Sequence, residues 1–191
     1  KNVWNNLEVL FENENLIVFD KPCGIDCEKN LPQGCFLVHR LDKTTSGVWV
    51  CAKTKEEAAY LSNLISNRKF EKSYIAILQG KIEQTSGILQ DYLYHDKIKN
   101  KSYVVKKERK GTKLAILEYN LEKVTDDNNS LVKIKLKTGR THQIRVQFAS
   151  RGYPLLGDKK YGSKIERSEI ALLCYQIKFD DYVFTTKKTL L

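Results

Sequence analysis

Methionine is absent from this 191-residue chain, and proline and glycine are scarce, at three and ten residues. No apolar run approaches the roughly 20 residues that a membrane-spanning helix needs, and no signal peptide precedes the first strand pattern. No glycine-rich nucleotide loop, internal repeat or low-complexity tract is present either. We therefore expect a cytoplasmic protein that does not enter a membrane, of a length that suits one domain with a substantial core.

Acidic residues are also in deficit, because 23 Asp and Glu accompany 33 Lys and Arg and leave a net charge of +10. Such an excess attracts polyanions, with nucleic acid as the first candidate and an anionic membrane surface as the second. The basic residues gather between positions 91 and 113, and three tyrosines lie among them: Lys97, Lys99, Lys101, Lys106, Lys107, Arg109, Lys110 and Lys113, with Tyr92, Tyr94 and Tyr103. A charge run often marks only a solvated face, but the aromatic rings favour a loop or hairpin that contacts nucleic acid.

The five cysteines are odd in number and irregularly spaced, which indicates reduced thiols rather than a disulfide framework. Cys23, Cys27, Cys35 and His39 lie close enough in sequence to raise the question of a metal. No pair among them has the two-residue gap of a zinc knuckle, so we predict no metal site. A zinc- or thiol-dependent enzyme built on these four residues remains the weaker alternative.

Apolar residues alternate with polar ones over most of the chain, which predicts strands. The predicted strands lie near residues 7–12, 16–20, 35–38, 48–52, 72–80, 115–121, 132–136, 170–179 and 182–184. In the strand at 132–136 apolar residues alternate with lysines. The hairpin that this strand forms with the strand at 115–121 is therefore expected to be buried on one face and cationic on the other. Helices are predicted after Thr54, in capping-box form with Glu57, and from about Thr141 to a C′ residue at Gly152. The fold class is therefore α+β, with a mixed, largely antiparallel sheet and a few flanking helices.

Two segments carry most of the chemistry. The first, Val38–Lys53, reads as strand, turn and strand, with Asp42 at the mouth of the turn. The second, 137–146, places Arg140 and Arg145 at a strand-to-helix corner. An aspartate at a turn usually only accepts backbone hydrogen bonds. A carboxylate within about 4–6 Å of an arginine, however, has its pKa lowered by roughly 1–3 units and stays a charged nucleophile.

Both segments resemble the RluA family of pseudouridine synthases. The matching motifs, in chain order, are Asp20–Gly24, His39–Asp42 with Thr45–Gly47 and Ala52–Lys53, Lys72–Ala76, Gly139–Arg145, and Gly157–Asp158 with Tyr161–Gly162. The resemblance runs from about residue 7 to about residue 179. Several motifs in the same order are far more specific than any one of them.

The resemblance implies a single catalytic domain over residues 1–191, with a bent sheet and a central basic cleft and without the small RNA-binding domain that precedes it in some relatives. It also implies an isomerase that converts a uridine in structured ribosomal or transfer RNA to pseudouridine, without cofactor or metal. The glycosidic bond breaks at N1, the uracil rotates, and the sugar rejoins at C5. A monomer is expected. A non-catalytic, chaperone-like RNA-binding protein that uses the same cleft remains the rival class.

By this resemblance Asp42 is the catalytic carboxylate, Arg145 pairs with it, and Tyr74 contacts the target base and helps to move its proton. The target base must be flipped out of its stack, and Arg40 is the candidate that fills the gap, with an ion pair at the turn as the equal alternative. Three roles are open for Lys21 from the sequence: an ordinary surface lysine, a ligand of an RNA phosphate, or a partner of the active-site acid.

Three further residues are assigned to substrate binding. Arg140 is a fixed cation beside the helix start, and His142 either packs there or contacts RNA. By resemblance Leu172 is the apolar residue under the target base. Without the resemblance, Arg145 itself would be read as a surface arginine.

Overall fold

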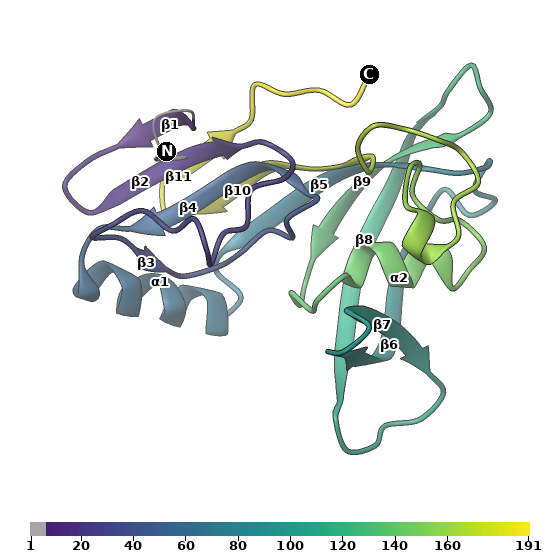
Figure 1. Cartoon of the computed structure of the whole chain (residues 1–191), viewed down its shortest axis with the longest axis horizontal. Coiled ribbons are helices and arrows are strands. Elements are labelled where there is room, and N and C mark those ends of the chain that lie inside the picture. The colour runs from purple at the N-terminus through teal and green to yellow at the C-terminus, as the bar shows by residue number, and fades with distance from the viewer. Residues whose placement is uncertain (1–6) are drawn as a thin grey trace. The chain divides into compact units, whose positions relative to one another are not determined.

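The computed structural model describes residues 7–191, and the chain in it forms two compact units (Figure 1). The first unit comprises the chain up to Ser73 together with Leu173–Thr189 and Leu191. The second unit comprises Tyr74–Leu172 and Leu190. The predicted domain covers 1–191, and its first six residues lie outside the described part.

The first unit is built on four hydrogen-bonded strands in the order β1-β2-β4-β10, with β3 beside β4 and β11 beside β10. Their bounds are β1 (Glu8–Glu12), β2 (Leu16–Lys21), β3 (Phe36–Leu37), β4 (Ser46–Ala52), β10 (Leu172–Phe179) and β11 (Tyr182–Thr185). These strands pair antiparallel, except that β10 runs parallel to β4. Strand β4 is buried along its whole length, because it has neighbours on both edges and side chains packed on both faces.

A glycine allows the close approach of β10 to β4. Gly47 has φ +121°, and a Cβ atom at this position would lie 2.0 Å from the carbonyl oxygen of Cys174. A side chain is therefore excluded both by backbone conformation and by space. This contact fixes the first residues of β4, which follow the turn that carries Asp42.

One helix covers part of this unit (Figure 1). Helix α1 (Lys55–Ser66) begins after Thr54, whose hydroxyl accepts a hydrogen bond from the Glu57 N–H at 3.1 Å. The predicted N-cap is thereby confirmed. Leu61 and Leu64 are buried, and the helix lies against β3 and β4.

The second unit contains five neighbouring strands in the order β5-β9-β8-β6-β7. Their bounds are β5 (Glu71–Leu78), which begins in the first unit, β6 (Ser86–Asp96), β7 (Lys101–Val105), β8 (Thr112–Val124) and β9 (Ser130–Leu136). The pairs β6–β7, β6–β8 and β8–β9 are antiparallel. The basic stretch, predicted to be a loop or a hairpin, includes the β6–β7 hairpin, and its contact with nucleic acid stays a prediction.

Helix α2 (Gln143–Ala149) packs on one face of these strands, and a short 3₁₀ helix, η2 (Lys159–Tyr161), lies next to it (Figure 1). Leu93, Ala115 and Val146 form a buried cluster between sheet and helix. The helix starts two residues later than predicted. Its predicted C′ glycine is confirmed, because Gly152 has φ +88° and the next residue, Tyr153, donates its N–H to the Phe148 carbonyl at 3.0 Å.

The fold class is therefore confirmed as a mixed, largely antiparallel sheet with flanking helices. In the part of the chain from residue 7 onward, no helix is both long and apolar enough to cross a membrane.

Candidate active site

Asp42 lies in the first unit, in the loop that connects β3 to β4. Its carbonyl accepts a hydrogen bond from the Thr45 N–H at 2.9 Å and so closes the predicted turn. Along the preceding residues burial alternates: His39 and Leu41 are buried, Arg40 is exposed and Asp42 is half-buried. The two inward side chains anchor the segment, and the two outward ones carry its charges.

His39 is one of the two anchors. Its Nε2 accepts the Val50 N–H at 2.9 Å, and its ring lies 5.3 Å from that of Phe70. Burial lowers the pKa of His39 to about 3, so the imidazole is neutral near pH 7. The histidine therefore acts as a fixed acceptor for β4 and not as an acid or base.

The alternative metal site does not form from these residues. The Cys27 thiol donates to the carbonyl of Leu41 at 3.5 Å, and burial raises its pKa to about 11. Among residues 7–191, no group of three His, Cys, Asp or Glu side chains is arranged to hold a metal ion. Cys27 and His39 are instead buried under the turn, where each has a hydrogen bond to a backbone group.

Lys21 lies at the end of β2 and is completely buried. Its ammonium donates to the carbonyls of Pro22 at 3.0 Å, Ile25 at 2.8 Å and Lys43 at 3.4 Å. Burial lowers its pKa, and neighbouring thiols and Asp42 oppose that shift. The surface position considered from the sequence is wrong. Because carbonyls take up its three N–H groups, the geometry favours support of the Asp42 loop over a phosphate contact.

Arg40 makes the ion pair that was weighed against a role in the RNA stack. Its Nη1 lies 2.6 Å from Oε1 of Glu28, and both side chains are about half exposed, at 50% and 58%. Pairs this exposed contribute about 0–1 kcal/mol. Exchanging the pair for a contact with RNA therefore costs little, and the stacking role stays a prediction.

Arg145 lies on α2 in the second unit and is 4% exposed. Its Nε and Nη2 donate to the two carboxylate oxygens of Asp158 at 2.8 and 2.9 Å, and its guanidinium lies 5.0 Å from the centre of the Tyr161 ring. Two of its five N–H groups are used in this bidentate pair. The surface position considered without the resemblance is wrong, whereas the pairing with Asp42 stays a prediction.

Asp158 is a site residue that sequence reasoning missed. The motif Gly157–Asp158 was recognised, but no role was assigned to its carboxylate. The only signal was an acid in that motif and an arginine elsewhere in the chain, and their pairing depends on the packing of η2 on α2.

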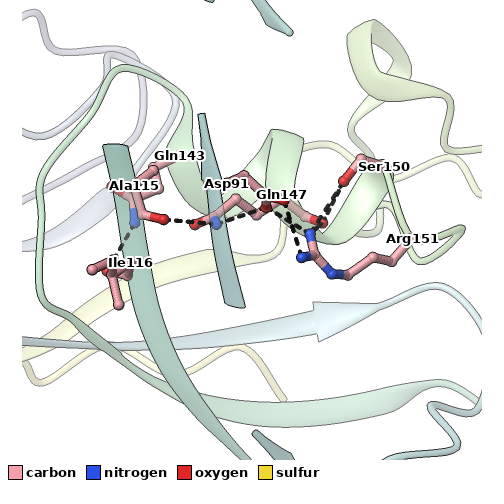
Figure 2. A network of polar contacts seen from close by, with 7 residues as sticks. All are labelled: Asp91, Ala115, Ile116, Gln143, Gln147, Ser150 and Arg151. Carbon is pink, nitrogen blue, oxygen red and sulfur yellow. Dashed lines mark hydrogen bonds and ion pairs between the residues drawn. The ribbon is translucent and has the colours of Figure 1, made fainter. Parts of the chain in front are cut away.

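Two glutamines fix α2 against the sheet on either side of Arg145 (Figure 2). Gln143 donates to the Ile116 carbonyl at 3.1 Å. Gln147 is fully buried and donates to Asp91 at 2.9 Å and to the Ala115 carbonyl at 3.3 Å. These bonds hold the helix register, and with it the position of the guanidinium.

Asp91 completes this network. Its carboxylate accepts from both terminal nitrogens of Arg151, at 2.7 and 3.2 Å, as well as from Gln147 (Figure 2). The C-terminal end of α2 is thereby tied to β6. Sequence reasoning missed both glutamines, since a polar residue in a short helix is usually solvated.

The remaining predicted substrate-binding residues lie in the second unit. Arg140 is half-buried and donates to the Leu114 carbonyl at 2.9 Å. His142, with φ +56°, is buried at the start of α2, and its Nδ1 lies 2.7 Å from the Tyr161 hydroxyl. That contact is the helix-start packing proposed for it.

Tyr74 on β5 and Leu172 at the start of β10 are 6% and 4% exposed. Burial of both side chains agrees with apolar surfaces that could support a base. Their contact with a target base stays a prediction, as does any RNA contact of Arg140 and His142.

Comparison with known proteins agrees with this geometry. Residues 15–150 match the family model described as RNA pseudouridylate synthase. The chain is 31% identical to ribosomal large subunit pseudouridine synthase D of Borreliella burgdorferi, over 91% of this chain and 61% of that protein. It is 32% identical to an uncharacterized RNA pseudouridine synthase of Haemophilus influenzae, over 91% and 82% of the two chains.

A solved structure, human RNA pseudouridylate synthase domain containing 1, has the same fold, with a TM-score of 0.81 at 20% identity over 96% of this chain and 83% of that one. The chain spans about three fifths of the length of several curated relatives. The matched segment includes the motifs around Asp42, Tyr74 and Arg145. The resemblance predicted from the sequence is confirmed, and the chain belongs to the RluA family of RNA pseudouridylate synthases.

Proposed function

We propose that this chain isomerises a uridine in RNA to pseudouridine, with Asp42 as the catalytic carboxylate and with both units forming one catalytic domain. Family membership supports the reaction class. The observation that carries the assignment of Asp42 is the turn itself: buried His39, Leu41 and Lys21 support the loop, and the Asp42 residue on it is half-buried.

The reaction leaves the composition of the nucleotide unchanged. The bond between C1′ and N1 breaks, the uracil turns over, and C1′ bonds to C5. C5 then loses its hydrogen as a proton, and N1 gains a proton. Asp42 acts in this sequence as nucleophile or as stabiliser of developing positive charge, and both roles require its ionised form. Tyr74 supports the uracil and helps to move the C5 proton: its oxygen accepts that proton as its own hydroxyl proton passes to solvent, and N1 takes up a proton from solvent.

Arg145 is proposed to keep Asp42 ionised, as the family resemblance implies. Asp158 orients the guanidinium through two hydrogen bonds of 2.8 and 2.9 Å, and both partners are buried. An arginine oriented in this way presents its other N–H groups in a fixed direction.

The substrate base must leave its stack to reach a buried site, at a cost of a few kcal/mol that is smaller in a loop or mismatch. Arg40 is proposed to occupy the vacated position, because its exposed ion pair with Glu28 is easily exchanged. The names of several relatives specify ribosomal large subunit RNA. We propose ribosomal RNA as the substrate, with transfer RNA as the second candidate, and a monomer as the active form.

The test compares wild type with Asp42→Asn, in which the carboxylate is lost and the side-chain volume is kept. Pseudouridines in cellular RNA are mapped with the gene present, deleted or replaced by the variant. We expect one or a few sites to lose pseudouridine in the deletion and in the variant, while the purified variant still binds RNA. If no site depends on the gene, or if Asp42→Asn restores modification, the proposal is wrong and a non-catalytic RNA-binding protein becomes the better description.

A further inference from the structure

The sheet of the second unit has two faces of very different exposure. On the face toward α2, Leu93, Ala115 and Leu117 are each no more than 4% exposed. On the other face of the same strands Ile88, Tyr94 and Tyr103 are 64%, 37% and 36% exposed. We call this second surface, along β6, β7 and β8, the outer face.

Two tyrosines lie side by side on the outer face. Tyr94 and Tyr103 are direct partners across the β6–β7 ladder, and Tyr92 is the next residue of β6 that points the same way. Opposed residues of an antiparallel pair have Cβ atoms about 4.5–5.5 Å apart. Tyr94 and Tyr103 therefore lie next to each other on one face of the sheet, 37% and 36% exposed.

Cations are held directly over these rings. The guanidinium carbon of Arg109 lies 5.7 Å from the centre of the Tyr94 ring, and the ammonium of Lys101 lies 5.6 Å from the centres of both the Tyr103 and the Tyr161 rings. The position of Arg109 is fixed by its turn, because Thr112 accepts from the Arg109 N–H at 3.0 Å and donates its hydroxyl to the Arg109 carbonyl at 2.7 Å.

The rim of the outer face is also basic. The turn between β7 and β8 contains Lys106, Lys107, Arg109 and Lys110, all exposed, with one acidic residue among them. On β9 the exposed Lys133 and Lys135 point to the same side, opposite buried Val132 and Ile134. The predicted buried and cationic faces of β9 are thereby confirmed. Lys133 is paired with Glu122 at 3.7 Å, and both lysines lie on the same face of the sheet as the tyrosines.

We propose that the outer face is a second RNA-binding surface, which takes an unpaired stretch of the substrate by stacking its bases on Tyr94 and Tyr103. Exposed aromatic rings on a sheet, flanked by cations, suit the flat bases and phosphates of a single strand and need no particular sequence. This surface lies on the face of the sheet opposite α2, which carries Arg145. It extends the proposed function by giving the enzyme a hold on RNA that is separate from the groups assigned to the reaction.

The test measures binding of the full chain to fluorescein-labelled oligouridine, roughly 12 nucleotides long, by fluorescence anisotropy. The variant is the double substitution Tyr94→Ser with Tyr103→Ser. Two controls accompany it: Tyr94→Phe with Tyr103→Phe, which keeps both rings, and Tyr60→Ser, which removes a tyrosine of 44% exposure on α1. Circular dichroism and thermal unfolding confirm that each protein is folded.

We expect the Ser double variant to bind roughly five- to a hundredfold more weakly, while both controls stay within twofold of wild type. Arg109→Gln is expected to reduce the salt dependence of log K by about 0.7. Binding of the Ser double variant within twofold of wild type would overturn the proposal and leave the face to a protein partner, and equal losses in Tyr60→Ser would do the same.

Two further outcomes keep this proposal distinct from the proposed function. Asp42→Asn is expected to bind oligouridine as wild type does, because Asp42 is not part of the outer face. If the tyrosine variants lose affinity in a protein that forms no pseudouridine, the surface stands and the isomerase assignment fails. If pseudouridine forms and the tyrosines do not matter for binding, the isomerase stands and the surface is disproved.

Discussion

Replacing Asp158 by Leu leaves the Arg145 guanidinium buried without the partner that takes up two of its hydrogen bonds. The two side chains are 5% and 1% exposed, so solvent does not replace the lost carboxylate. Breaking one half of such a pair costs about 3–5 kcal/mol, mostly as the penalty of the uncompensated charge. For a chain of this size that corresponds to a fall in Tm of roughly 6–20 °C.

The matching double variant separates this charge penalty from loss of packing. In Arg145→Leu with Asp158→Leu, both charges are gone and two apolar side chains fill a buried space, a change that is often close to neutral. We expect it to recover most of the stability lost by Asp158→Leu. Urea unfolding of wild type, both single variants and the double variant gives the coupling free energy as a double-mutant cycle.

Activity is expected to follow a different order from stability. The double variant lacks Arg145 and is expected to be inactive although stable. Asp158→Asn keeps one acceptor oxygen for the guanidinium and is expected to retain partial activity. If the double variant is as unstable as Asp158→Leu, or if it isomerises uridine normally, the account of this pair is refuted.

Two other predictions test groups near Asp42. Lys21→Met removes the ammonium that donates to the part-buried carbonyls of Pro22 and Ile25, so we expect a loss of about 1–3 kcal/mol in the free energy of unfolding and a fall in kcat, with the RNA Kd unchanged. A weaker RNA Kd at constant kcat would instead favour the phosphate contact. His39 has a folded-state pKa of about 3 against an ordinary value of 6.5, so the unfolded chain binds more protons between these values and stability falls as pH drops through that window. At pH 5 the loss relative to pH 7 is about 2 kcal/mol, and His39→Gln, which keeps an acceptor for the Val50 N–H, is expected to remove this part of the pH dependence in urea unfolding.

Local elements of this fold were predictable because their causes are local. Thr54 as N-cap and Gly152 as C′ residue follow from hydrogen-bond chemistry within a few residues, and both are observed. The alternation of apolar residues and lysines on β9 predicted its buried and cationic faces for the same reason. Element ends were less accurate, as the later start of α2 shows, because His142 takes a left-handed conformation that no neighbour dictates.

The amino-acid sequence alone determined the family, the order of the motifs and the identity of the candidate catalytic acid. The tertiary structure decided which charged and polar side chains are buried: Lys21 under the Asp42 loop, Asp158 beside Arg145, and Gln143 and Gln147 along α2. Burial of a polar group depends on partners that come from distant parts of the chain, such as the Ala115 and Ile116 carbonyls for the two glutamines. Periodicity and spacing contain no information about those partners, and a lone lysine or glutamine therefore looks like a surface residue until the fold supplies its acceptors.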